Sequence, residues 1–322
     1  MNQTEWKHYN NWYDNRYTPY NYYIPPHKKK IKKKNMKIEN FNDLIKFFNN
    51  IDYYYVKNID IEVLRKMRFS LNRLDNMIGL DDIKEKIFYQ LIFFLQRLDN
   101  VHNDMLHTII EGDPGLGKTE LAKILGDIYC CLRNFNKFHS LKRSDLVGEY
   151  LGQTAVKTQN KLKECLNGVV FIDEAYSLGN DEKKDSYSKE AIDTLTSFLS
   201  ENKQNIIVII AGYKDDLNKC FFNYNKGLES RFTWRFKTDN YSYHELHNIF
   251  LKKIKDNGWS IKEGEVISDK WFEKNIDYFK YFGRDMETLF AKVKISHSRR
   301  VFCLPKDQKT TITMKDMDKG LE

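Results

Sequence analysis

Residues 107–125 read HTIIEGDPGLGKTELAKIL, and this stretch decides the fold of the chain. It contains the phosphate-binding pattern G-x-x-x-x-G-K-[ST] at residues 112–119. A short β-branched run precedes the pattern, and Leu121, Ile124 and Leu125 follow it at helical spacing. The stretch therefore predicts a buried strand, a glycine-rich loop and an amphipathic helix, in that order.

The predicted loop is suited to binding the phosphates of a nucleotide. Its glycines let backbone N–H groups face an anion, and the helix that follows adds unpaired N–H groups and the positive end of its dipole. In this pattern Lys118 supplies a charge to the β- and γ-phosphates and Thr119 supplies a hydroxyl to Mg²⁺. The alternative is a glycine-rich turn that matches by chance. The residues expected to contact the nucleotide are Gly112, Asp113, Pro114, Gly115, Leu116, Gly117, Lys118, Thr119 and Glu120.

A second apolar run ends in two acidic residues, Asp173 and Glu174. Residues 168–172 read GVVFI, which is typical of a strand buried on both faces of a parallel sheet. Because ligands bind beyond the carboxyl ends of parallel strands, both carboxylates should emerge beside the phosphate loop. We expect Asp173 to hold Mg²⁺ and Glu174 to orient and deprotonate the water that attacks ATP. Two solvent-facing acids at a strand end are the alternative.

The rest of the chain predicts an α/β fold, a nucleotide-binding domain with a mostly parallel five-stranded sheet, followed by a small α-helical lid domain. Further strands are expected at 137–141 and 206–211 and helices at 154–166 and 186–201, and after residue 241 helices alone, at 242–256, 268–281 and 284–301. The expected segments are a disordered basic tail (1–36), a helical lead-in (37–73), the α/β domain (74–240) and the lid (241–322).

Composition narrows the class of protein. The 322 residues carry a formal charge of +8, a mild surplus because 45 acidic residues face 53 basic ones. Five cysteines without a C-x-x-C pair argue against a disulfide framework or a zinc site. We find no signal peptide and no apolar run long enough for a membrane span, so we expect an intracellular protein of the cytoplasm, with the nucleus as the alternative. The lysine run from Lys28 to Lys34 is either a nuclear address, a nucleic-acid contact or a solvated charge block.

With these motifs the sequence resembles the AAA+ ATPases, from about Leu74 to the end of the chain. The phosphate loop, the acidic strand end at Asp173 and the helical region behind it carry the resemblance. More narrowly, three segments resemble the group of CbbX-type rubisco activases and stage V sporulation protein K: DLVGEYLGQTA at 145–155, DEAYSL at 173–178 and AGYKD at 211–215. The resemblance implies a Mg²⁺-ATP hydrolase that forms a homo-oligomer, a hexameric ring, and remodels a protein client.

The resemblance also implies roles for residues outside the phosphate loop. Tyr150, with Leu151 and Gly152, would lie in the central pore and grip a polypeptide; the alternative is a tyrosine packed beneath its loop. Ile78 and Gly79 would line the adenine pocket.

Two arginines are implied as contacts of the nucleotide. Arg231 would be the arginine finger that reaches the neighbouring subunit's γ-phosphate, with Arg235 as a rival. Arg284 would be the second sensor, although Asp285 beside it offers a local neutralising partner. One position departs from the pattern: many AAA+ proteins carry Asn or Thr as first sensor where this chain has Tyr213.

Two other functions remain open from the sequence alone. One is a nucleic-acid-associated ATPase anchored by the run from Lys28 to Lys34, which we do not favour because no basic, aromatic-interleaved groove is visible elsewhere. The other is a nucleotide-gated scaffold that hydrolyses ATP slowly. Nothing in the sequence identifies the protein client.

Overall fold

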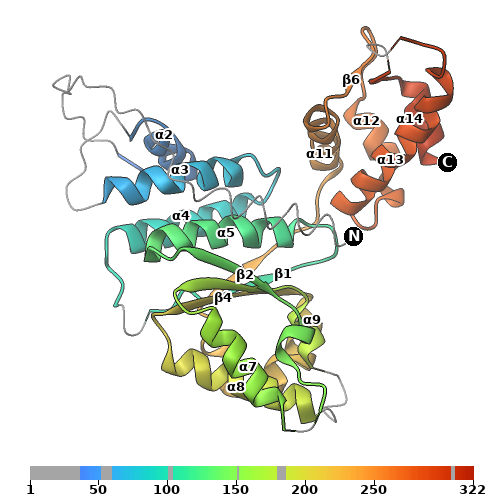
Figure 1. Cartoon of the computed structure of the whole chain (residues 1–322). Helices are drawn as coiled ribbons and strands as arrows, with labels where there is room; N and C mark the ends of the chain where they lie inside the picture. Colours follow the sequence, from blue (N-terminus) through green and yellow to red (C-terminus); the bar gives the residue numbers. More distant parts are fainter. Residues whose placement is uncertain (1–36, 52–59, 101–103, 151, 180–185, 306–308) are drawn as a thin grey trace.

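The computed structural model describes residues 37–51, 60–100, 104–150, 152–179, 186–305 and 309–322 (Figure 1). The predicted tail, with the run from Lys28 to Lys34, lies outside the described residues, as does Leu151. Among the described helices, none combines the length and the apolar character that a membrane crossing needs.

A five-stranded parallel sheet forms the centre of the molecule, with the strand order β2-β3-β4-β1-β5. Its strands are β1 (Thr108–Glu111), β2 (Lys137–Leu141), β3 (Gly168–Ile172), β4 (Ile206–Gly212) and β5 (Trp234–Lys237). Strands β1, β3 and β4 are buried along their whole length, as their continuous apolar runs predict. The predicted fold class is confirmed.

Helices cover both faces of this sheet (Figure 1). Side chains alternate between the faces along each strand, so Ile110 packs with α4 (Asp81–Leu95) and α5 (Lys118–Arg133). Its neighbour Ile109 packs with α7 (Thr154–Glu164) and α8 (Ser186–Glu201). Helix α9 (Lys214–Cys220) completes the second layer, together with the short helices α6 (Arg143–Leu146) and α10 (Lys226–Glu229).

Two N-terminal helices join the first of these layers. Helices α2 (Phe41–Asn49) and α3 (Ile61–Asp75) share one hydrophobic core with α4, α5 and the sheet. Arg73 of α3 forms ion pairs of 2.6 Å with Glu120 and 2.9 Å with Asp127, both on α5. The segment we expected as a lead-in is therefore tied directly to the helix behind the phosphate loop.

A helical region follows β5 and is called the lid below. It contains α11 (Tyr243–Asp256), α12 (Asp269–Lys274), α13 (Gly283–Arg300) and α14 (Met314–Leu321), around a core of its own. Two short strands pair in parallel within the lid. They are β6 (Ser260–Ile261), which follows α11, and β7 (Thr311–Ile312), which precedes α14. Figure 1 shows the lid standing to one side of the sheet, connected by the segment after β5.

The predicted helix over 268–281 is wrong in its second half. Helix α12 ends at Lys274, and a 3-10 turn follows at Ile276–Tyr278. The side chain of Asn275 donates a hydrogen bond of 2.8 Å to the Trp271 carbonyl. Asparagine competes with the backbone for such bonds, which ends the helix there.

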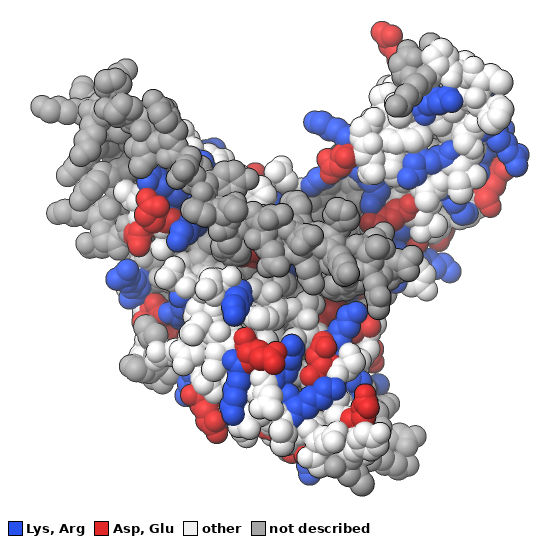
Figure 2. Space-filling model, in the orientation of Figure 1, with Lys and Arg blue, Asp and Glu red and all other residues white. Residues whose placement is uncertain are grey.

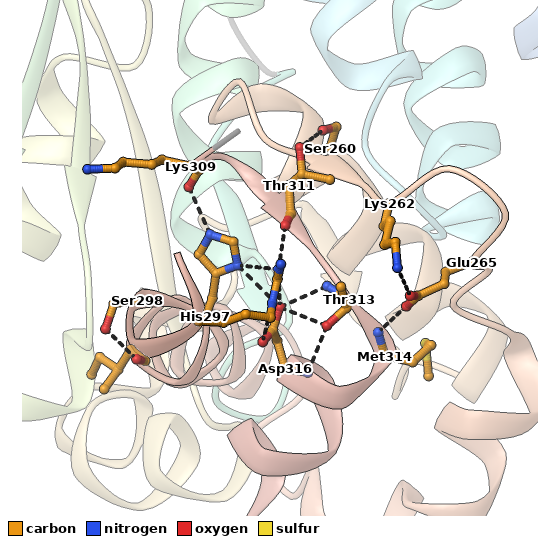
Figure 3. Close-up of polar contacts among 12 residues, drawn as sticks. Ser260, Lys262, Glu265, His297, Ser298, Lys309, Thr311, Thr313, Met314 and Asp316 are labelled. Carbon is orange, nitrogen blue, oxygen red and sulfur yellow. Dashed lines mark hydrogen bonds and ion pairs between the residues drawn. The ribbon is translucent and has the colours of Figure 1, made fainter. Parts of the chain in front are cut away.

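Asp316 joins three elements of the lid (Figure 3). The side chain is buried, at 3% exposure, and accepts hydrogen bonds from Arg300 Nη2 (2.9 Å) and from the backbone and hydroxyl of Thr313 (2.9 and 3.0 Å). His297 Nδ1 lies 3.2 Å from the same carboxylate. Burial alone would raise the pKa of Asp316, but these hydrogen bonds lower it to about 2.

We expect Asp316→Asn to destabilise the lid by about 2 kcal/mol at pH 7, because the folded state holds this carboxylate ionised below its ordinary pKa. The contribution is present above the unfolded pKa and is lost as the pH falls toward 2, so about half should be gone near pH 3. Urea unfolding followed by tryptophan fluorescence measures it. The exposed Asp277→Asn variant is the control, and equal stability of the two variants at pH 7 would contradict the assignment.

Candidate functional site

The phosphate loop lies between β1, which ends at Glu111, and α5, which begins at Lys118. Gly115 has a φ of 80°, and a Cβ at this position would come within 1.9 Å of the Tyr281 carbonyl oxygen. Only glycine fits there, because the backbone is left-handed and the lid approaches closely. The predicted order of strand, loop and helix is confirmed.

Lys118 folds back onto its own loop. The ammonium donates hydrogen bonds of 2.7 Å to the Gly112 carbonyl and 2.6 Å to the Asp113 carbonyl. Burial lowers the pKa of Lys118, and nearby acids including Asp173 oppose that effect. The charge therefore lies at the mouth of the loop, where a polyphosphate would replace the two carbonyls as its partner.

The remaining residues of the predicted nucleotide loop contribute in different ways. Leu116 is fully buried and packs into the core of the lid, so it anchors the loop. Glu120 pairs with Arg73 and is thereby held toward α3. Pro114, Gly112 and Gly117 lie in the loop itself, where they contribute backbone.

Thr119 and Asp173 meet beside the loop, as the sequence predicts. The Thr119 hydroxyl donates a hydrogen bond of 2.7 Å to the Asp173 carboxylate. Both are hard oxygen ligands of the kind that Mg²⁺ takes. Among the described residues no group of three or more His, Cys, Asp or Glu side chains could hold a metal by itself. The pair thus fits Mg²⁺, which typically binds one or two protein oxygens together with phosphates.

Glu174 follows Asp173 in an unusual backbone conformation. Its φ of 50° and ψ of 48° are left-handed, and its N–H donates a 3.1 Å hydrogen bond to Asp173. The side chain is exposed at the carboxyl edge of the sheet. A non-glycine residue in this region is rare and typically marks a site where function requires the geometry.

The lid contacts the phosphate loop directly at the start of α13. The Gly283 N–H donates a 3.0 Å hydrogen bond to the Gly115 carbonyl, which brings Arg284 close enough to Lys118 to help lower its pKa. Within the described part of the chain no ion pair is found for Arg284, whereas Glu287 on the same helix pairs with Lys253. Asp285 instead accepts a 2.6 Å hydrogen bond from the Tyr281 N–H. In the described residues Asp285 therefore does not pair with Arg284, and the contact of Arg284 with phosphate stays a prediction.

Gly79 lies against the first helix of the lid. A Cβ at Gly79 would come within 2.3 Å of Glu245 and 3.2 Å of Tyr241. Tyr241 Oη also lies 3.5 Å from the Leu116 carbonyl. Gly79, directly after Ile78 in the chain, thus lies against the lid and next in sequence to a cleft lined by Leu80–Ile83, Lys237, Asp239–Tyr241 and Glu245.

The two candidate arginine fingers have different partners. Arg235 on β5 forms ion pairs of 2.9 Å with the buried Glu111 and 2.8 Å with Glu229. Removing Arg235 would leave the buried Glu111 carboxylate unpaired, which would destabilise the folded protein. Arg231 bonds only neutral groups in the described residues, among them the Ser200 hydroxyl at 2.8 Å and the Gly227 carbonyl. Arg231 would therefore leave no buried charge unpaired if it turned away from these partners, and its role as arginine finger stays a prediction.

Arg231 lies at the opposite end of the strands from the phosphate loop. Burial and the nearby Arg231 lower the pKa of His107, the residue directly before β1, to about 4. The loop follows the other end of β1, so the length of a four-residue strand, about 13 Å, separates the two. Arg231 thus lies toward the end of β1 that is opposite to the phosphate loop of its own chain.

Tyr150 extends into solvent, with 68% of its surface exposed. It belongs to the loop after β2 and α6, at the sheet edge farthest from β5. The alternative of a tyrosine packed beneath the loop is wrong. Gly152, two residues on, has nothing within 4 Å of the position a Cβ would take, so this tip of the loop is open.

Two tyrosines of the site were not expected from the sequence. Tyr241 reaches the phosphate loop from the lid, and Tyr176 stacks on Tyr213 beside Glu174. Tyr176 belongs to DEAYSL at 173–178, a segment that carries the resemblance, but no role was expected of it. Tyr241 carried no local signal, since its partner is 125 residues away in the chain.

Comparison with known proteins gives the following. Residues 108–237 match the family described as ATPase family associated with various cellular activities (AAA). The chain is 42% identical over 249 residues to the putative cfxQ-like protein R730 of Acanthamoeba polyphaga mimivirus, covering 76% of this chain and 61% of that protein. It is 35% identical over 195 residues to stage V sporulation protein K of Bacillus subtilis, covering 58% and 60%. It thus spans about three fifths of the length of these two relatives.

A third relative matches over most of its own length. Protein CbbX of Cereibacter sphaeroides is 32% identical over 263 residues, which are 77% of this chain and 84% of CbbX. Among solved structures, the AAA domain of FIGL-1 in complex with ADP aligns with a TM-score of 0.55 over 76% of this chain and 82% of that chain. At 17% identity this likeness concerns the fold alone.

Proposed function

The chain belongs to the AAA ATPase family, as a homologue of CfxQ and CbbX, and we propose that it works as a Mg²⁺-dependent homo-oligomeric ring that remodels a protein client. Family membership implies that it binds and hydrolyses ATP. The Mg²⁺, the ring, its hexameric size and the threading of a polypeptide are proposals. So is the division into tail, lead-in, α/β domain and lid.

Hydrolysis follows from the residues around the phosphate loop. Lys118 holds the β- and γ-phosphates, Arg284 approaches them from the lid, and Glu174 accepts a proton from the attacking water. When bound to Thr119 and Asp173, Mg²⁺ would neutralise charge on the phosphates. The lid contacts the loop through the hydrogen bond from Gly283, and this contact would help to exclude bulk water from the reaction.

One observation supports the proposal that the chains assemble into a ring. Arg231 lies a strand's length from the phosphate loop of its own chain, yet bonds only neutral groups that it can exchange. A head-to-tail neighbour could present its Arg231 to this loop, and such heterologous contacts close into rings. AAA proteins are typically oligomeric, which supports the proposal.

The exposed loop around Tyr150 is the proposed contact with the client. Aromatic side chains offer a large contact area that does not depend on the sequence of the partner. A relative from Cyanidioschyzon merolae, 29% identical, is named as a chloroplastic ribulose bisphosphate carboxylase/oxygenase activase. The residues described above do not select that client, and we propose only that the client is a protein.

We expect Tyr150→Ala to leave basal ATP turnover within about twofold and to abolish client capture, since the side chain is 68% exposed and its loss should disturb the fold little. Purified Glu174→Gln protein with ATP serves as the trap, with and without Tyr150→Ala, and retained proteins are identified by mass spectrometry. Val156→Ala, which truncates another exposed apolar side chain, is the matched control. Equal retention by the two traps would exclude a role for Tyr150 in gripping the client.

A nucleic-acid-associated ATPase is the second candidate. Figure 2 shows Lys and Arg interspersed with Asp and Glu over the α/β part, instead of one continuous basic surface on this face. The run from Lys28 to Lys34 lies outside the described residues. ATP turnover stimulated by DNA or RNA, with a steep loss of binding in salt, would favour this candidate.

A further inference from the structure

One side chain of the phosphate loop is buried in the core of the lid. Leu116 stands between Gly115 and Gly117 in the loop, and it is 0% exposed. It belongs to the same hydrophobic cluster as Leu246 of α11 and Met286 of α13. Because its whole apolar surface is removed from water among lid residues, this side chain holds the lid and the loop together.

Polar contacts beside Leu116 reinforce this anchor. The Gly283 N–H donates a 3.0 Å hydrogen bond to the Gly115 carbonyl, and Tyr241 Oη lies 3.5 Å from the Leu116 carbonyl. The lid therefore holds two consecutive residues of the loop, through two backbone carbonyls and one side chain.

The lid residue that precedes α13 has a strained backbone. Phe282 has a φ of 47° and a ψ of −114°, a region that residues other than glycine rarely occupy. Its ring packs against Tyr241, with the ring centroids 6.4 Å apart and an interplanar angle of 76°. Such a conformation persists only where the surrounding contacts fix it. The start of α13, with Arg284 two residues later, is therefore held in one orientation against the loop.

We propose that Leu116 is a positioning residue for ATP hydrolysis: its side chain locks the lid onto the phosphate loop and thereby sets the place of Arg284. Arg284 lies in the first turn of α13, next to the glycine that bonds the loop. Because the Leu116 side chain is buried among lid residues, it acts through Arg284 and not on the nucleotide itself. The inference rests on the proposed contact of Arg284 with the phosphates.

ATP turnover of the full chain tests whether the two residues act in series. Arg284→Ala and Leu116→Ala should each lower kcat about tenfold, because the guanidinium is either removed or out of place. The double variant should be no more than about twofold slower than Arg284→Ala, whereas independent effects would multiply to about a hundredfold. Leu116→Met keeps the apolar volume and should keep kcat within about twofold of the unaltered chain. If Leu116→Ala does not fold, Leu116→Val tests the same series with a smaller loss.

Hydrogen exchange measures the contact between lid and loop directly. In Leu116→Ala the Gly283 N–H should exchange about tenfold faster or more, because its hydrogen bond to Gly115 opens more often. The Val293 amide, in the middle of α13, should keep its rate. Met317→Ala truncates another fully buried side chain of the lid core, on α14, and is the control that should leave the Gly283 rate unchanged.

The outcomes separate this inference from the proposed function. Multiplied losses in the double variant, or an unchanged Gly283 rate in Leu116→Ala, would overturn the role of Leu116 alone. Weaker ATP binding in Leu116→Ala with an unchanged Gly283 rate would assign Leu116 to the fold of the loop instead. Normal kcat in Arg284→Ala would overturn the contact of Arg284 with the phosphates, and the positioning role with it.

Discussion

Replacing Glu174 with Gln is expected to lower ATP turnover by about a thousandfold and to leave ATP binding within about twofold. The amide keeps the size and shape of the side chain, but it cannot take a proton from water. Steady-state phosphate release gives the turnover, and a fluorescent ATP analogue gives the affinity. Binding survives because Lys118, Thr119 and the loop backbone, which hold the phosphates, are unchanged.

Two controls make that result specific. Glu164→Gln removes another exposed carboxylate, one that pairs with Lys161 on α7, and should leave turnover unchanged. Lys118→Ala should weaken nucleotide binding itself, because the loop loses its only ammonium charge on the phosphates. Turnover retained in Glu174→Gln would refute its role as base, and lost binding in the same variant would show that the residue holds the nucleotide instead.

Most of the fold was legible in the sequence because its signals are local. The buried strands β3 and β4 are continuous apolar runs, and the phosphate loop needs its own glycines and lysine wherever it occurs. The edge strand β5 was not located. It reads WRFK, with only Phe236 buried, and it forms a strand because β1 beside it offers unpaired backbone groups.

Contacts between distant parts of the chain could not be predicted in the same way. Gly283 contacts Gly115 only because the folded lid lies against the phosphate loop. Tyr213 contacts Tyr176 only because the ends of β3 and β4 lie side by side in the sheet. Arg235 pairs with Glu229, which is near in sequence, and with Glu111, which is on another strand. The residues around Arg235 in the sequence do not indicate the pairing with Glu111. The structure adds that Arg235 pairs with a buried carboxylate, whereas the described partners of Arg231 are neutral. That Arg231 is the arginine finger stays a prediction.

Replacing Arg231 with Ala is expected to lower ATP turnover by about a thousandfold, since an arginine finger stabilises charge on the transferred phosphoryl group. ATP binding to each chain should persist, because Arg231 lies away from its own phosphate loop. Steady-state phosphate release measures the loss. Arg299→Ala, which truncates an exposed arginine of α13, is the control and should have no effect.

Mixing two inactive variants decides whether Arg231 acts on a neighbour. Arg231→Ala chains keep an intact Glu174, and Glu174→Gln chains keep an intact Arg231. In a ring with head-to-tail contacts, random mixing in equal amounts completes about one site in four, so turnover should return to about a quarter of normal. If Arg231 served its own chain, no mixed assembly would hold a complete site and turnover would stay lost. Recovery on mixing thus requires both the trans contact and an assembly of at least two chains.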